Sequence, residues 1–122
     1  MTIAEAIREA DRLKPNGFPT ETKILWLERL DKRILREILT HYEGELPEEP
    51  AYNTEDLSKT LLVPAPYEEM YIHWLACQMD YYEREYDAFN ASNAMFEAVY
   101  GRFRNEYNRS HLAIGAKKSY LS

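Results

Sequence analysis

Cysteine and glycine are scarce in this sequence, and each scarcity excludes a kind of site. Cys77 is the only cysteine, so the chain cannot form an internal disulfide or a zinc site built on paired cysteines. The four glycines lie far apart, at positions 17, 44, 101 and 115. They cannot build the glycine-rich loop that holds phosphate in nucleotide-binding enzymes.

Long apolar runs are also missing. No stretch approaches the roughly 18 apolar residues that a membrane-spanning helix needs, and the opening MTIAEAIREADR is amphipathic and charged. We therefore expect no membrane anchor, no signal peptide and synthesis in a cytoplasm. The net charge of −6 argues against a protein that grips nucleic acid, because such proteins need a basic surface to neutralise phosphates.

Aromatic residues at helical spacing are what the sequence does have, above all in residues 64–108. The chain contains ten tyrosines, four phenylalanines and two tryptophans. Tyrosine combines an apolar ring with a polar tip, so it suits half-buried surfaces and interfaces. We expect residues 64–108 to supply the helical centre of the fold.

The spacing of apolar residues predicts helices over 2–14, 20–42, 66–89 and 93–109. In the first, Thr2 and Glu5 have the spacing of a capping box, and apolar residues recur every three or four positions. A chain of 122 residues suffices for one hydrophobic core. We predict an all-α fold, a small bundle of about four helices. Residues 1–111 would form one domain and residues 112–122 a flexible or docking tail.

The third and fourth predicted helices share one register. From Tyr82 the steps of four and three run through positions 86, 89, 93, 96, 100, 103 and 107. This pattern is also typical of one continuous helix of about 40 residues, which would span roughly 60 Å. We favour a break at residues 90–93, Asn-Ala-Ser-Asn, because these side chains cap and turn well. A domain this small cannot cover so long a rod by itself, so the single rod is the alternative for an oligomer.

A long acidic loop is predicted over residues 43–65. Together with Pro66 it holds four of the six prolines, which prevent regular helix. A loop of this length is either functional or ordered by packing. Residues 60–63 either form an extended segment that pairs with a neighbouring subunit or lay Leu61 and Val63 on the core, and we favour the second reading.

Patterns that carry catalysis or bind metal are not found. The three histidines lie in different segments, and none follows a glutamate by three residues as in di-iron bundles. We interpret Glu69 and His73 as a surface ion pair rather than as metal ligands. Cys77 lies in an apolar, aromatic helix, which indicates a buried structural thiol and not a nucleophile. We predict no catalytic residue, no metal, no cofactor and no enzymatic activity.

The surplus of tyrosine and tryptophan predicts a protein interface, because interfaces favour Tyr, Trp and Arg. The candidate interface residues are Tyr67, Tyr71, Trp74, Tyr82, Tyr86, Tyr107 and Arg109. Charge is segregated as well: residues 43–87 hold twelve carboxylates against Lys59 and Arg84, whereas the C-terminal end is basic. This separation favours docking between subunits, and a solvated, disordered tail is the alternative.

Several short motifs resemble a known group. They are LVP-x-PY before the third helix, Leu75-Ala76 with Gln78-x-Asp80, then Asn90-x-Ser92, Met95-Phe96 and Tyr107-Asn108-Arg109-x-His111. KILWLERLDKRILREIL, followed by Thr40-His41-Tyr42-Glu43, is similar to that group's second helix. The group consists of small prophage proteins from Gram-positive bacteria that resemble the head–tail connector (adaptor) family of tailed phages. The likeness covers most of residues 1–111.

The resemblance implies a mostly helical adaptor with no catalytic residues. Its subunits would form a ring beneath the portal and join it to the tail or its stopper protein. The partners implied are further copies of the chain and portal or tail proteins, with DNA only as passing cargo and no membrane or small-molecule substrate. The expected location is the host bacterial cytoplasm during assembly, and the virion if the prophage is functional. The alternative is a small helical protein-binding or regulatory module without catalytic activity.

Overall fold

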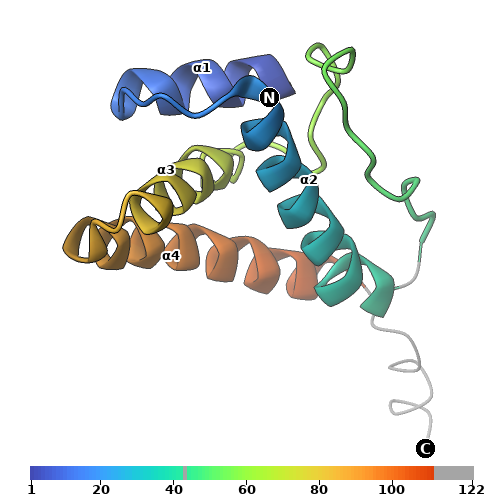
Figure 1. Cartoon of the computed structure of the whole chain (residues 1–122). Coiled ribbons are helices and arrows are strands. Elements are labelled where there is room, and N and C mark those ends of the chain that lie inside the picture. Colours follow the sequence, from blue (N-terminus) through green and yellow to red (C-terminus); the bar gives the residue numbers. More distant parts are fainter. Residues whose placement is uncertain (43, 112–122) are drawn as a thin grey trace, which may run out of the picture.

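The computed structural model describes residues 1–42 and 44–111, and it confirms the all-α prediction for them. The helices are α1 (Ile3–Leu13), α2 (Thr20–Glu37), the short 3-10 helix η1 (Leu39–His41), α3 (Met70–Tyr82) and α4 (Tyr86–Ser110), with no strand in the described part of the chain. α3 and α4 run side by side, and α1 lies across α3 (Figure 1). α2 crosses the pair at the end where α3 begins and α4 ends. The predicted tail, residues 112–122, lies outside the described residues.

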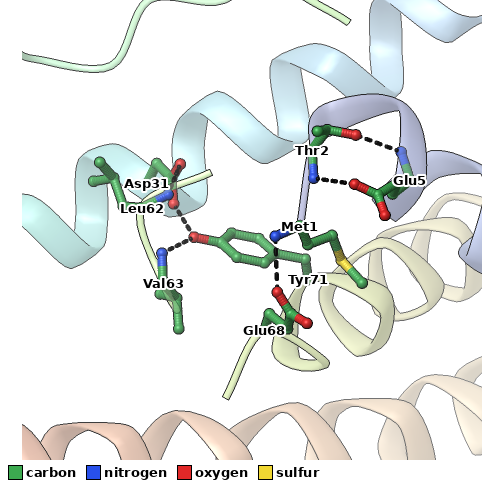
Figure 2. A network of polar contacts seen from close by, with 8 residues as sticks. All are labelled: Met1, Thr2, Glu5, Asp31, Leu62, Val63, Glu68 and Tyr71. Atoms are coloured by element: carbon green, nitrogen blue, oxygen red, sulfur yellow. Dashed lines mark hydrogen bonds and ion pairs between the residues drawn. The ribbon is translucent and has the colours of Figure 1, made fainter. Parts of the chain in front are cut away.

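The start of α1 is fixed locally and at long range. Thr2 Oγ1 accepts a hydrogen bond from the Glu5 amide at 3.1 Å, and the Glu5 carboxylate accepts one from the Thr2 amide at 3.0 Å, which confirms the capping box. Two further amides of the first turn, those of Ile3 and Ala4, donate to the carbonyls of Lys59 and Leu57. The terminal amine also pairs with Glu68 at 2.8 Å (Figure 2).

α2 ends earlier than predicted, at Glu37 instead of residue 42. Thr40 Oγ1 donates to the carbonyl of Arg36 at 2.8 Å, a side-chain bond that competes with continued α-helix. Ile38 has φ −118° and ψ −62°, and η1 follows. α2 carries two ion pairs between residues four positions apart, Glu28 with Lys32 and Arg33 with Glu37.

The long segment between η1 and α3 is ordered by packing on its own chain. Pro50, Tyr52, Leu61 and Val63 are buried in it, which confirms that Leu61 and Val63 lie on the core. Thr60 forms an isolated antiparallel bridge with Thr2. The segment therefore belongs to the described domain, and its pairing partner is the N-terminus of the same chain.

Asp31 is the polar centre that joins this segment to the helices. Its carboxylate is fully buried and accepts hydrogen bonds from the hydroxyls of Tyr52 and Tyr71 and from the amide of Leu62. The Tyr71 hydroxyl oxygen in turn accepts a hydrogen bond from the amide of Val63 at 2.8 Å, so this hydroxyl links Asp31 to the loop (Figure 2). Burial raises the pKa of Asp31, and the three donors oppose that rise.

This raised pKa predicts a pH effect that Asp31→Asn removes. A carboxyl group whose pKa is higher in the folded state binds its proton more tightly when folded, so its contribution to stability grows as the pH falls through the folded pKa. The free energy of unfolding of the wild type, relative to Asp31→Asn, should therefore increase between about pH 7 and about pH 4. Urea unfolding of both proteins over this pH range measures the difference in their free energies of unfolding. A difference that does not change with pH would contradict the prediction.

The reversal between α3 and α4 corrects the predicted break at residues 90–93. The chain turns at residues 83–85, where Arg84 has φ +60°, and residues 90–93 lie inside α4. Ser92 does not cap a helix: its hydroxyl donates to Asp80 at 2.8 Å and ties α4 to α3. The single rod is also wrong. The start of α3 also differs from the prediction: α3 begins at Met70 instead of residue 66, and turns occupy the residues just before it.

Arg84 occupies a left-handed conformation that favours glycine. Arg84→Gly should raise the free energy of unfolding by roughly 0.5–1 kcal/mol, because the left-handed penalty of about 1–2 kcal/mol exceeds the entropic cost of glycine. Glu83→Gly is the matched control, since Glu83 has φ −84° and gains nothing from glycine. Thermal and urea unfolding measure both, and an equal loss in the two variants would contradict the prediction.

Candidate functional site

The described residues offer no constellation for metal chemistry. They contain no group of three or more His, Cys, Asp or Glu side chains that could hold a metal ion. The ion pair expected between Glu69 and His73 is not formed in them. Glu69 pairs instead with Arg102 of α4 at 3.3 Å, because α4 packs beside the start of α3.

Cys77 is a structural thiol, as predicted. It is 1% exposed, and its thiol donates to Asn93 Oδ1 at 3.7 Å. Burial, with a smaller effect from Asp80, raises its pKa to about 11. A thiolate is therefore scarce near neutral pH, and the geometry assigns Cys77 to the contact between α3 and α4.

The thiol of Cys77 should be protected from modification in the native protein. At about pH 8 we expect it to react with an aromatic disulfide reagent on the order of a hundredfold more slowly than in the denatured chain, since burial limits both thiolate and access. The release of the coloured thiol, followed with and without urea, gives the ratio. Similar rates in the two conditions would show that the thiol is exposed.

An aromatic groove of about 530 Å³ lies at the C-terminal end of α4. Three parts of the chain build it: η1, the turns before α3 and the last turns of α4. The lining residues are Leu39, Leu62, Pro64, Ala65, Pro66, Tyr67, Phe103, Glu106, Tyr107, Ser110 and His111. This volume lies within the range of pockets that enclose ligand groups in proteins.

Stacked rings form the wall of the aromatic groove. Phe103, Tyr107 and His111 are each four residues apart, so they share one face of α4. Tyr67 packs on Phe103 with ring centroids 5.7 Å apart, and Tyr107 stacks on His111 at 3.7 Å. Burial, followed by the nearby Tyr42, raises the pKa of Tyr107. The groove therefore presents ring faces, with Glu106 and Ser110 as hydrogen-bonding groups.

The opposite end of α4 carries an aromatic corner, which we define as Tyr81, Tyr82 and Tyr86. These side chains at the α3–α4 reversal are 51%, 53% and 58% exposed. Tyr82 stacks on Trp26 with centroids 5.7 Å apart. The acidic residues around the corner are Asp80, Glu83, Glu85 and Asp87.

Lys14, which follows α1, brings a cation to the acidic residues around the aromatic corner. It forms ion pairs with Asp80, Glu83 and Glu85, and its bond to the buried Asp80 raises the pKa of Lys14. Arg84 is the other cation within residues 80–87. The corner is therefore both aromatic and net acidic.

The structure divides the predicted interface residues among three places. Tyr67 and Tyr107 line the aromatic groove, with Arg109 exposed on the same turns of α4, whereas Tyr82 and Tyr86 belong to the aromatic corner. Tyr71 is corrected to the core, because it is fully buried and bonded to Asp31.

Trp74 belongs to neither surface. It is half-buried between helices: its indole N–H donates to the carbonyl of Trp26 at 2.8 Å, and its ring packs on Phe96. Phe103 and His111 are groove residues that the prediction missed, although their spacing from Tyr107 placed them on its face.

Comparison with known proteins found no match, whether among family models, curated proteins or solved structures. Within the described residues, no helix has the length and apolar character that crossing a membrane requires.

Proposed function

We propose that the protein is a structural subunit of a tailed-phage head–tail connector, which assembles with copies of itself into a ring under the portal. One observation supports this most: two aromatic surfaces, the aromatic groove and the aromatic corner, lie at opposite ends of α4. A ring subunit needs two different faces that meet in a head-to-tail contact. The resemblance of most of residues 1–111 to prophage proteins that are similar to the connector family supplies the biological setting.

The charge of the chain fits this role. A net charge of −6 permits DNA to pass through a ring lumen without strong binding, because few phosphates would be neutralised. The partners are then further copies of the chain and the portal or tail proteins. Assembly would take place in the host cytoplasm, and the subunit would become part of the virion if the prophage is functional.

The aromatic groove favours a second candidate function, a small helical module that binds a peptide. Its rings and prolines offer stacking surfaces, and Glu106 and Ser110 offer polar contacts, so a short extended segment of another protein could bind there. Such a module needs only the groove, and it makes no use of the aromatic corner.

Inspection of the neighbouring genes, and co-expression with a portal protein encoded among them, separate the two candidates. A connector should co-purify with the portal protein in a fixed ratio, and native mass spectrometry should show a ring or a stable portal complex. A strictly monomeric chain that does not bind the portal protein, or a gene with no portal or capsid genes beside it, would overturn the connector and favour the peptide-binding module.

A further inference from the structure

The aromatic corner exposes a cluster of tyrosine rings, a feature typical of surfaces that another protein covers. Its three tyrosines are each more than half exposed, and two of them are in contact: the rings of Tyr81 and Tyr82 have centroids 5.2 Å apart. Clustered exposed rings are costly to leave in water and are enriched at the centre of protein interfaces. Tyr82 is already held on its inner side by stacking on Trp26, so little side-chain entropy remains to be lost on binding.

The aromatic groove offers the complementary surface. Tyr67, Phe103 and Tyr107 present rings at separations of 5.7 and 5.9 Å, and Pro64 and Pro66 are exposed beside them. Tyrosine side chains entering this groove would pack against rings and prolines. Glu106 and Ser110 also line the groove; the Glu106 carboxylate pairs with Arg109, and the Ser110 hydroxyl donates to the carbonyl of Glu106.

The two surfaces also differ in charge, the aromatic corner being acidic and the end of α4 basic. The aromatic corner is surrounded by three exposed carboxylates, Glu83, Glu85 and Asp87, against Arg84, whereas Asp80 is buried and paired with Lys14. The last turns of α4 carry Arg102, Arg104 and Arg109, of which Arg102 pairs with Glu69 and Arg109 with Glu106, so this end keeps a positive balance. Arg109 and Arg102 are exposed, with 75% and 63% of their side-chain surface in contact with solvent. Complementary charge of this kind orients partners during encounter.

We propose that the aromatic corner of one copy binds in the aromatic groove of the next copy. The two surfaces lie at opposite ends of a 25-residue helix, which is roughly 37 Å long, so one molecule cannot satisfy the contact by itself. The contact is heterologous, and it closes into a ring or continues as a filament according to the rotation between copies. This inference rests on the self-assembly of the proposed connector and names its two faces.

Two substitutions block one surface each. Tyr86→Lys places a cation at the aromatic corner, and Ser110→Trp fills the aromatic groove; both positions are exposed, so the fold should be retained. Met95→Lys is the matched control, because Met95 is an exposed apolar residue of α4 (54%) outside both surfaces. Circular dichroism and thermal unfolding verify that each full-length variant is folded.

Sedimentation velocity and native mass spectrometry over a wide concentration range give the test. The wild type and Met95→Lys should self-associate, and each blocked variant should do so at least about tenfold more weakly. An equimolar mixture of the two blocked variants should form a heterodimer and nothing larger, since one copy keeps its corner and the other its groove. Raising the salt concentration should weaken the wild-type association.

Three results would overturn the proposed contact. They are a wild type that stays monomeric throughout, blocked variants that assemble like the wild type, and a mixture that forms no heterodimer. The portal experiment is independent of all three. If the chain binds the portal protein but gives one of these three results, the connector function stands and the proposed contact is wrong. If the chain self-associates through the aromatic corner and the aromatic groove but does not bind the portal protein, the contact stands and the connector function is wrong.

Discussion

Replacing Asp31 with alanine is expected to lower the free energy of unfolding by about 3–5 kcal/mol. The substitution removes the acceptor of the Tyr52 and Tyr71 hydroxyls and of the Leu62 amide in a buried place. Each buried donor left without a partner costs roughly 1–3 kcal/mol. Urea unfolding followed by circular dichroism measures the loss.

Glu97→Ala is the control for this prediction. Glu97 is an exposed carboxylate of α4, so its removal should change stability by no more than about 0.5 kcal/mol. Asp31→Asn should fall between the two, because an amide keeps one acceptor oxygen and a similar shape. A stability of Asp31→Ala equal to that of the control would show that the buried hydroxyls find other partners.

Trp74→Ala is expected to lower the free energy of unfolding by about 3 kcal/mol, the lower end of the range for truncating a large aromatic side chain. The indole is half-buried, which places the loss at that lower end. The alanine variant loses the packing of the indole on Phe96, at a centroid distance of 5.1 Å, and the hydrogen bond from the indole to the Trp26 carbonyl. Thermal unfolding provides the measurement.

Trp74→Phe separates the two contributions of this residue. It keeps a ring against Phe96 and removes the donor, so a loss of about 1 kcal/mol is expected. An alanine variant that melts like the wild type would place the Trp74 side chain on the surface of the protein in solution.

Local chemistry accounts for the parts of the fold that the sequence predicted well. α1 starts at a capping box and ends before Pro15-Asn16-Gly17, so both signals lie within a few residues of the boundary. Leu61 and Val63 belong to a short run of apolar residues, Leu61-Leu62-Val63, and both lie on the core as predicted. Such signals require no knowledge of distant parts of the chain.

The α3–α4 reversal could not be located in this way. Aromatic residues continue in steps of three and four across residues 83–85, because the aromatic faces of both helices meet each other, as in the contact of Trp74 with Phe96. Arg84 is not a residue type that marks a turn. The polar residues at 90–93 looked like a break, yet Ser92 and Asn93 serve contacts with Asp80 and Cys77 of α3.

The candidate site was predicted only in part for a related reason. Residue type indicated Tyr67, Tyr82, Tyr86 and Tyr107 as surface aromatics, but the same reasoning included Tyr71, whose hydroxyl has a buried acceptor 40 residues away in Asp31. The aromatic groove depends on turns before α3 meeting the end of α4, a contact between distant segments. Its volume and its separation from the aromatic corner follow from the tertiary structure alone.

The attachment of the N-terminus has a consequence for the order in which the protein folds as it is made. The amides of Ile3 and Ala4 bond to the carbonyls of Lys59 and Leu57, and the Met1 carbonyl accepts the amide of Leu61. A ribosome produces these partners only after half of the chain has been synthesised. α1 can therefore dock on this segment only after residues 57–61 have followed it out of the exit tunnel.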